Sequence, residues 1–564
     1  MPSNDSKKRH VRKKIWKPKT KTGCITCRVR RVKCDEANPS CLRCTSTGRK
    51  CDGYTTAPSS PLSAGLVFSS RPSSPPFAIP ELYLESIEEQ EAFYFFCKQT
   101  SIELSGFFDS NFWQCELLQA SHSYPAIRYA ATALGAMHRK LKVGKVPVVP
   151  DDVSDRQLRF ALMQSNRAIQ ELLLSPSRKT IGDKVNMMTH CVLFNCLACI
   201  QGHQSLALEH LRSGLRILRE VDEDLAVGGD EFGPHPVSLC TLRAIFVNMD
   251  VQARAIMSDD SLAIWEPQPR RDFAVQRTSF KNILQARAYF ESTFNDVLAF
   301  MQSLDVCPPT SETHREAVIQ ELTCIRQQFN VGTGLLEDLL SNPAISVDMN
   351  TTIGIRLIHD QIKAWLEAFS SFDFDGMRDL GWGMQEDDLR VIVELASQLL
   401  QAPFDLTLPH GAVPADFYPS EADRNYGSGR PMPALAEPVF FSGSGVLSAL
   451  FAVVSRARDP LLRRRAVALL LSYPRREGMW DSVLAGRIAW EAIMLEEADT
   501  YEEMSLHERH TNPGRLGRTP DIPDSNRIRD IAITYTGLRV ATVEFRNVEQ
   551  YKAGLPGFRR EIAW

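Results

Sequence analysis

The chain has 564 residues, 43% hydrophobic and 24% charged, which is enough for one large or two to three ordinary domains with their own cores. This composition excludes disorder throughout and a small disulfide scaffold. The net charge of -3 conceals a division of the chain. Residues 1–54 carry 16 Lys and Arg against four acidic residues, a formal charge of +12, while the other 510 residues carry −15. Such asymmetry is typical of a small nucleic-acid-binding module joined to a large acidic body.

Six of the 14 cysteines lie between positions 24 and 51, in the pattern C-x2-C-x6-C-x6-C-x2-C-x6-C. They are Cys24, Cys27, Cys34, Cys41, Cys44 and Cys51. No apolar stretch typical of a secretory signal precedes them, so we expect a reducing compartment in which thiolates bind metal. Thiolates favour tetrahedral zinc, but six sulfurs are two short of the eight that two separate sites need. Two shared ligands would close this gap, and the repeat at an offset of 17 residues nominates the equivalent Cys24 and Cys41.

The segment CITCRVRRVKCDEANPSCLRCTSTGRKC resembles the fungal Zn2Cys6 binuclear-cluster domain of zinc-cluster transcription factors. The resemblance implies two zinc ions per chain. The implied ligand sets are Cys24, Cys27, Cys34 and Cys41 for one ion, and Cys24, Cys41, Cys44 and Cys51 for the other. The resemblance also implies a nuclear, zinc-dependent regulator of RNA polymerase II transcription that reads CGG-type triplets in double-stranded DNA.

Basic residues distinguish the two halves of this segment. Between the second and third cysteines lie Arg28, Arg30, Arg31 and Lys33. The corresponding interval of the second half has only Arg49 and Lys50. We therefore predict that the first half enters the major groove, where arginine matches the O6 and N7 acceptors of guanine. By the resemblance, Arg30 and Arg31 would lie nearest the bases, and Arg28 and Lys33 nearest the phosphates.

The predicted zinc module, residues 23–54, lies between two segments of different character. Residues 1–22 form a basic arm that we interpret as a nuclear import signal, a set of phosphate contacts or a solubilising tail. Residues 55–80 hold six prolines and seven serines with no acidic residue, which predicts a disordered linker. Because these prolines forbid a continuous coiled coil, we expect a monomeric DNA-binding module and any homodimer to form through the body.

Helical periodicity dominates from residue 81 onward, so the fold class is mostly α, with a large all-helical body over 81–564. Ser154 and Gln157 read as a capping box that opens a helix ending at 174. Asp459 and Pro460 read as an N-cap followed by proline at the first helical position. The apolar face of another predicted helix comprises Leu208, Leu211, Leu215 and Leu218.

The end of the chain has a different periodicity. Ile531, Ile533 and Tyr535 alternate with other residues before Gly537, and β-branched residues follow over 540–545. This pattern predicts a short C-terminal β-hairpin.

The body has no motif that indicates catalysis, so we expect no enzyme. It contains no GxSxG, GxGxxG, Walker A or HExxH sequence, and His507 and His510 read as surface residues. Residues 185–208 are uncharged but include polar side chains, which indicates a buried helix rather than a membrane span. Within this stretch, His190, Cys191, Cys196 and Cys199 read as core residues rather than metal ligands.

Three body segments, 106–138, 190–218 and 459–490, resemble the regulatory domain of the same fungal family, which implies contacts with the transcription machinery or co-regulators. An acidic run either makes such contacts or forms a solvated helix end: Glu496, Glu497, Asp499, Glu502 and Glu503. Two other functions remain open at this point. The chain could be a metabolic protein that carries a zinc-cluster module, or a non-transcriptional DNA-binding scaffold.

Overall fold

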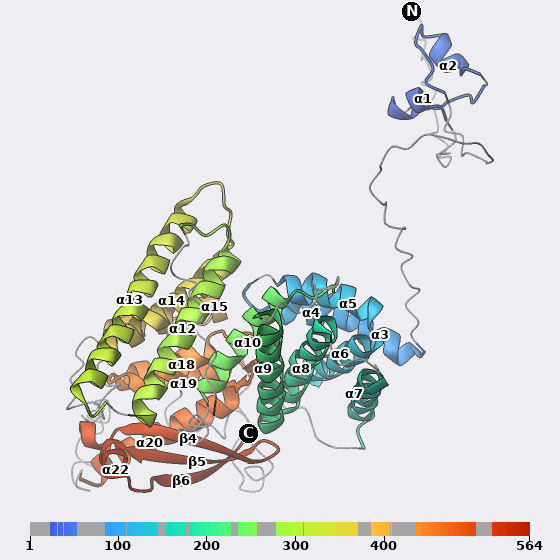
Figure 1. Cartoon of the computed structure of the whole chain (residues 1–564). Coiled ribbons are helices and arrows are strands. Elements are labelled where there is room, and N and C mark those ends of the chain that lie inside the picture. Colours follow the sequence, from blue (N-terminus) through green and yellow to red (C-terminus); the bar gives the residue numbers. More distant parts are fainter. Residues whose placement is uncertain are drawn as a thin grey trace, which may run out of the picture. The chain divides into compact units, whose positions relative to one another are not determined.

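The structure is a computed structural model that divides into two compact units, Met1–Ala78 and Ile79–Trp564 (Figure 1). It describes residues 23–30, 32–37, 39–53, 85–108, 110–144, 154–174, 180–226, 235–256, 265, 278–307, 309–369, 385–406, 408, 436–503 and 522–564. Several sequence predictions fall outside these ranges. They concern the basic arm 1–22, the linker 55–80, Arg31, His507 and His510.

The described part of the first unit has two short helices, α1 (Ile25–Val29) and α2 (Leu42–Thr45). Its buried cluster consists of four fully buried cysteines, with the remaining two partly buried against them: Cys24, Cys27, Cys41, Cys44, Cys34 and Cys51. A segment of this length cannot bury an adequate apolar core, so its stability depends on what binds the sulfur atoms.

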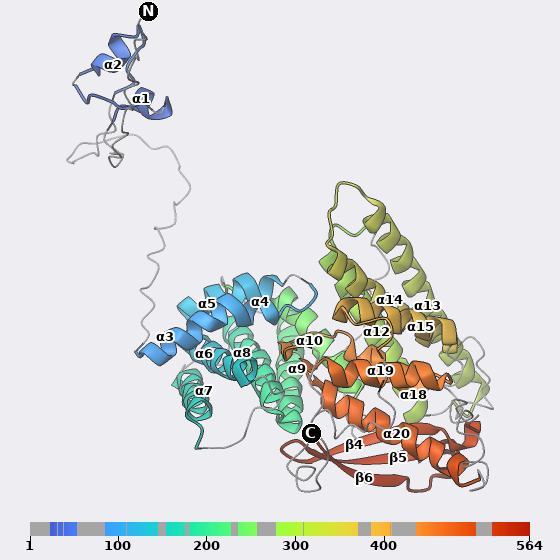
Figure 2. The ribbon, with the colours of Figure 1, turned by 180° about the vertical axis from the view of Figure 1, so that it is seen from behind.

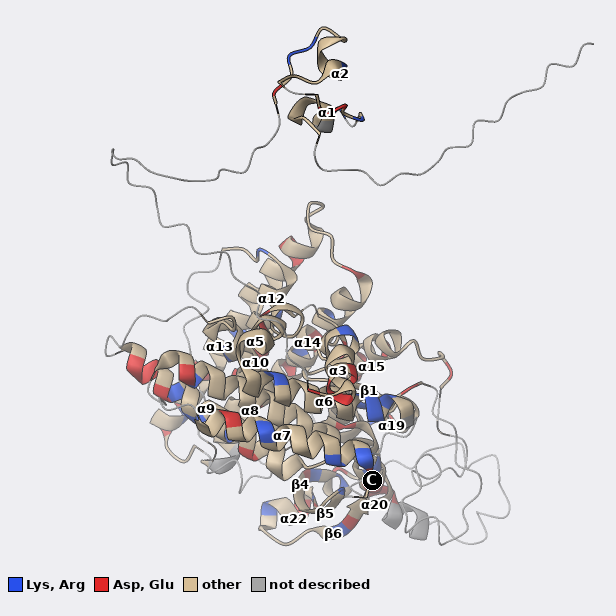
Figure 3. Cartoon of the chain, turned by 90° about the vertical axis from the view of Figure 1, so that its right-hand side faces the viewer, with Lys and Arg blue, Asp and Glu red and all other residues tan. Residues whose placement is uncertain are grey.

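The second unit begins with packed helices (Figures 1 and 2). They are α3 (Ile87–Phe95), η1 (Phe96–Thr100), α4 (Ser101–Glu103), η2 (Phe112–Glu116), α5 (Leu117–Ser123), α6 (Pro125–Gly144), α7 (Arg156–Leu174), α8 (Ile181–Gln201) and α9 (Gln204–Ala226). Neighbours in sequence pack as pairs, α6 with α7 and α8 with α9. Acidic and basic residues both occur along these helices (Figure 3).

Five further helices are described next: α10 (Leu239–Arg254), α12 (Ile283–Val306), α13 (Glu312–Ser341), α14 (Met349–Ala368) and α15 (Glu386–Leu400). The helix α12 packs against α10, α13 and α14, and α15 packs against α14. Figure 1 shows α12 and α13 side by side as a long helical hairpin.

The last part of the unit combines helices with two small sheets. The helices are α18 (Leu447–Arg456), α19 (Pro460–Ser472), α20 (Ser482–Glu503) and α22 (Val548–Ala553), with the short η5 (Asp524–Asn526). In the first sheet, β1 (Val439–Phe441) pairs in parallel with β2 (Arg475–Glu477), which pairs antiparallel with β3 (Trp480–Asp481). The second sheet is an antiparallel meander of β4 (Ile528–Gly537), β5 (Val540–Asn547) and β6 (Phe558–Ala563).

The predicted C-terminal hairpin is confirmed by β4 and β5, whose register places Ile531 opposite Phe545 and Ile533 opposite Val543. The third strand, β6, was not predicted. Its sequence FRREIA shows no apolar alternation, because it is an edge strand whose first four residues are exposed. The helix α20 covers this sheet and packs against β4 and β6.

Of the two helix starts predicted from capping residues, one is confirmed and the other is wrong. Asp459 caps α19 as predicted, with Pro460 at the first helical position. The predicted Ser154–Gln157 capping box is wrong. Asp155 Oδ1 instead accepts the backbone N–H of Leu158 at 2.9 Å, so α7 begins at Arg156. A carboxylate beside the helix N-terminus also interacts favourably with the helix dipole.

The uncharged stretch 185–208 forms most of α8 and the start of α9, and no helix in the described ranges is long and apolar enough to cross a membrane. The prediction of core packing is confirmed for Cys196 and Cys199, which are buried, while His190 Nδ1 lies 2.8 Å from the carbonyl oxygen of Asn186. Burial raises the pKa of the Cys199 thiol to about 12, so this thiol stays protonated.

The prediction of an exposed acidic run is wrong for Glu496 and Glu497, each only 1% exposed. Arg463 and Arg464 of α19 bind their carboxylates, so neither glutamate is available for a protein partner. A buried carboxylate requires such a partner because desolvation otherwise disfavours its charged form. The side chains of Asp499, Glu502 and Glu503 lie outside the described residues.

Candidate zinc and nucleic-acid site

The first cysteine of each half of the module lies at the start of a helix. Cys24 Sγ accepts the backbone N–H of Cys27 at 3.4 Å, and Cys41 Sγ accepts that of Cys44 at 3.3 Å. The x2 spacing therefore brings both sulfurs of a CxxC pair to one helix N-terminus, where partial positive charge favours thiolate.

The third cysteine of each half returns to the same helix start. Cys34 Sγ accepts the backbone N–H of Cys24 at 3.4 Å, and Cys51 Sγ accepts that of Cys41 at 3.5 Å. These bonds are related by the same offset of 17 residues as the cysteines themselves. The repeat in the sequence is thus a repeat in backbone geometry.

The sulfur atoms gather into two overlapping groups of four. The groups, each with all sulfur atoms within 4.8 Å of one another, are Cys24, Cys27, Cys34 and Cys41, and Cys24, Cys41, Cys44 and Cys51. Cys24 Sγ lies 3.6 Å from Cys41 Sγ and 3.8 Å from Cys44 Sγ. A zinc ion with Zn–S bonds of about 2.3 Å places its tetrahedral sulfurs about 3.8 Å apart. The six cysteines thus form two tetracysteine sites that fit two zinc ions.

Electrostatics also favour a cation here. Burial raises the pKa values of Cys24 and Cys41, since desolvation disfavours the thiolate. Backbone N–H donors from Cys41 and Gly53 instead lower the pKa of Cys51. A buried group of thiolates at such short separations is stable only with cations between them, and thiolates select zinc among the common divalent ions.

Two aspartates that the sequence analysis missed tie the halves together. Asp35 accepts the backbone N–H groups of Leu42 at 3.2 Å and Arg43 at 2.9 Å, at the start of α2. Asp52 occupies the equivalent position after Cys51, and its Oδ2 accepts from the hydroxyl of Thr26 in α1 at 2.7 Å. Each aspartate therefore bonds to the helix of the opposite half. The signal in the sequence was a Cys-Asp pair that recurs at the same offset of 17.

The predicted DNA-binding residues lie in and after α1. Arg30 is half-buried and Lys33 is exposed, and the backbone N–H of Arg30 bonds to the carbonyl of Thr26 at 3.2 Å. Arg28 lies within α1, but its side chain is outside the described set, as is the whole of Arg31. Arg30 and Lys33 thus follow directly from the helix that Cys24 and Cys27 anchor.

Residues 22–60 match the family model described as the fungal Zn(2)-Cys(6) binuclear cluster domain. The chain is 28% identical to the aspercryptin biosynthesis cluster-specific transcription regulator atnN of Emericella nidulans, over 85% of this chain and 88% of that protein. It is 63% identical over 41 residues to the transcriptional regulatory protein moc3 of Schizosaccharomyces pombe, which is 7% of this chain and 8% of that protein. The Zn(2)-C6 fungal-type transcription factor afumD of Aspergillus fumigatus is 24% identical over 38% of this chain and 57% of that protein.

No solved structure matches the chain. These relatives are transcription regulators rather than enzymes, and the similarity to atnN extends through the helical body as well as the zinc module. With its duplicated cysteine pattern and two tetracysteine sites, the chain belongs to the fungal Zn2Cys6 binuclear-cluster transcription factors, with a helical regulatory domain after its DNA-binding module.

Proposed function

We propose that this regulator acts in the nucleus on RNA polymerase II promoters and reads CGG-type triplets through the first half of its zinc module. The observation that carries the proposal is the anchoring of α1 by Cys24 and Cys27, with the basic residues Arg30 and Lys33 directly after it. A short helix fixed in this way is the usual means by which such modules enter the major groove.

In this proposal, Cys24 and Cys41 bridge the two ions. Cys27 and Cys34 complete the first tetrahedron, and Cys44 and Cys51 complete the second. The two overlapping groups of sulfur atoms support this assignment, since Cys24 and Cys41 are the members they share. Zinc would supply the cross-links that replace an apolar core.

The basic residues divide into two roles. Arg30 and Arg31 bind guanine edges, whereas Arg28 and Lys33 bind phosphates and position the helix. Base contacts provide sequence preference, while phosphate contacts add affinity for every sequence and make it depend on salt. The second half of the module has few basic residues, since only Arg49 and Lys50 lie between its second and third cysteines. This supports the first half as the one that contacts the bases.

The targets that we propose are genes of a biosynthesis cluster. The similarity to atnN, a cluster-specific regulator of aspercryptin biosynthesis, spans most of both chains and includes the body as well as the widespread zinc module. The body, which we assign to 81–564, would then contact co-regulators at those promoters.

The test is selection of preferred sites from random duplex DNA by the full chain loaded with zinc, followed by genome-wide occupancy and transcript analysis. We expect a motif with a CGG-type triplet, occupancy at promoters, and altered transcripts of adjacent genes. Arg31→Ala in the full chain is the matched control and should lose the triplet preference. Occupancy without any change in transcripts would favour the non-transcriptional scaffold, and a motif without the triplet would overturn the proposed readout.

A further inference from the structure

The first helix of the zinc module has an exposed apolar face. Val29, the last residue of α1, is 79% exposed, and Ile25, one turn earlier, is 40% exposed. Val32, shortly after the end of the helix, is also 40% exposed. These three apolar side chains lie in the half of the module that we propose to contact the bases, and the proposed roles of its basic residues do not account for them.

The contacts of α1 show which way this face points. Cys27 is fully buried in the cysteine cluster, and successive residues of a helix are turned by about 100°, so Val29 lies on the opposite side of α1 from Cys27. On another side of the helix, the hydroxyl of Thr26 donates to Asp52 Oδ2 at 2.7 Å. The cysteine cluster and the second half of the module thus cover two sides of α1, and the side with Ile25 and Val29 faces solvent.

The second half of the module differs at the equivalent positions. The offset of 17 residues relates Ile25, Val29 and Val32 to Leu42, Ser46 and Arg49. Ser46 and Arg49 are polar, so the exposed end of the helix is apolar in the first half and polar in the second. The first half therefore differs from the second in this apolar face as well as in its larger number of basic residues.

Positive charge next to the apolar face restricts what can cover it. Residues 1–54 carry a formal charge of +12, and Arg30 and the exposed Lys33 follow directly after α1. A second copy of this basic module would be repelled, so the occupant is strongly anionic and also offers apolar atoms. The major groove of DNA has both properties, because phosphates flank it and the C5-methyl groups of thymine project into it.

The triplet indicates where such a thymine would lie. The proposed function, on which this inference rests, has Arg30 and Arg31 bound to a CGG-type triplet, which contains no thymine in either strand. The Cα atoms of Val29 and Arg30 are about 3.8 Å apart, close to the rise of about 3.4 Å per base pair. Val29 can therefore reach the base pair beside the one that Arg30 contacts, directly outside the triplet.

We propose that Val29 recognises a thymine directly beside the CGG-type triplet, by packing its methyl groups against the thymine C5-methyl group in the major groove. Arginine recognises the hydrogen-bond acceptors of guanine, whereas Val29 recognises the one apolar group that a base presents there. The preference arises because both sets of methyl groups are removed from water. The site of this protein is then one base pair longer than the triplet.

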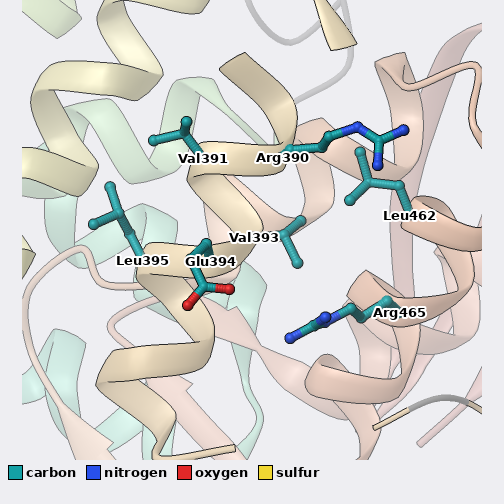
Figure 4. A pocket seen from close by; sticks show the side chains of 7 residues that line it. All are labelled: Arg390, Val391, Val393, Glu394, Leu395, Leu462 and Arg465. Atoms are coloured by element: carbon teal, nitrogen blue, oxygen red, sulfur yellow. The ribbon is translucent and has the colours of Figure 1, made fainter. Parts of the chain in front are cut away.

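An open groove in the second unit provides a control variant. It lies between α15 and α19, has a volume of about 370 Å³ and is lined by seven residues, among them Arg390 and Glu394 (Figure 4). Arg390 pairs with Asp459 at 2.6 Å, and Glu394 Oε1 accepts from Gln398 Nε2 at 3.1 Å. Since nothing in the described structure shows what covers this groove, Glu394→Gln serves only as a control in a different unit from α1.

Removal of a single methyl group from the DNA tests the contact. Sites are selected from random duplex DNA by the full chain loaded with zinc, and the thymine beside the triplet is then replaced by deoxyuridine, which lacks only the C5-methyl group. We expect the deoxyuridine duplex to bind about fourfold more weakly, the effect of one buried methyl group. Equal affinity for the two duplexes, or a selected triplet with no thymine beside it, would overturn the role of Val29 and leave the triplet readout intact. A selected motif without the triplet would overturn both.

Variants of Val29 assign the preference to this residue. Val29→Ala should abolish the difference between thymine and deoxyuridine, and it does not act by weakening α1, because alanine has a higher helix propensity than valine. Val29→Ile keeps an apolar side chain and should retain the difference. Ser46→Ala, at the equivalent position of the second half, and Glu394→Gln are the matched controls and should leave it unchanged. Zinc content per chain shows whether the module is intact in each variant. Loss of zinc from Val29→Ala, or a difference that persists in this variant, would contradict the assignment.

Discussion

Arg463 Nη1 in α19 lies 2.5 Å from Glu496 Oε2 in α20, and both side chains are almost completely buried. The other oxygen of Glu496 accepts the backbone N–H of Ile528 at 2.8 Å, at the start of β4. Arg463 Nε also bonds to the carbonyl of Val454 at 2.8 Å. One carboxylate thus holds together two helices and the first strand of the C-terminal sheet.

Breaking this pair should destabilise the body strongly. Glu496→Ala leaves a buried guanidinium without its partner, and we expect a loss of about 3 to 5 kcal/mol in the free energy of unfolding. Urea and thermal denaturation of the full chain measure it. The control is Glu491→Ala on the same helix, whose exposed pair with Arg560 is 3.7 Å long and should contribute less than about 1 kcal/mol. Replacing both members of the buried pair, Arg463→Met with Glu496→Leu, should recover part of the loss; no recovery would argue against an unpaired charge as its cause.

The proposed bridging ligands predict unequal effects among the cysteines. Cys24→Ser or Cys41→Ser should release both zinc ions, because each sulfur serves two tetrahedra. Cys27→Ser or Cys51→Ser should lose one ion more readily than the other. Zinc content per purified chain is the measurement, with two ions expected for the unchanged protein. Equal loss in all four variants would count against bridging.

Asp35 should support metal retention without touching the metal. Asp35→Ala removes the acceptor for the backbone N–H groups of Leu42 and Arg43, which weakens the start of α2. Caps of this kind correspond to a change of about fivefold in an equilibrium constant. Competition with a chelator should therefore show zinc affinity about fivefold lower, and Asp35→Asn, which keeps an acceptor, should recover most of it. Identical affinities for Asp35→Ala and the unchanged chain would show that this contact is dispensable.

Substitutions of residues that contact bases and of residues that contact phosphates should change the salt dependence of DNA binding differently. Arg31→Ala should reduce discrimination between matched and mismatched sites by about 1 to 3 kcal/mol, with a similar affinity for unrelated DNA. Neutralising Lys13 and Lys14 should weaken all sequences alike and reduce the slope of log affinity against log salt. Binding titrations at several salt concentrations distinguish the two. If both changes behave alike, the division between readers and phosphate contacts is wrong.

The spacing between triplets should be loosely specified. Six prolines over 55–80 prevent a coiled coil directly after the zinc module, so no rigid element sets the distance between two bound modules. Binding of the full chain to duplexes with two triplets at systematically varied separation should show no sharp optimum. A single strongly preferred spacing would show that the modules are held rigidly after all.

The sequence alone predicted those structural features whose residues lie close together along the chain. Six cysteines at two repeated spacings predicted two metal sites with shared ligands, because the number and softness of the donors restrict the metal and its geometry. Asp459 before Pro460 predicted the start of α19, since capping is complete within one turn. Alternation from Ile531 to Tyr535 predicted the β4–β5 hairpin, whose partner strand follows after a tight turn.

Only the tertiary structure decided features that depend on distant partners. Glu496 reads as a solvated acidic residue, but Arg463, 33 positions earlier, makes its burial possible. Glu477 is likewise buried, and its carboxylate accepts the backbone N–H groups of Val446 and Leu447 at 3.1 and 2.8 Å. A charged side chain can enter a core only where another part of the fold supplies its counterion or hydrogen-bond donors, and a linear pattern does not contain that information.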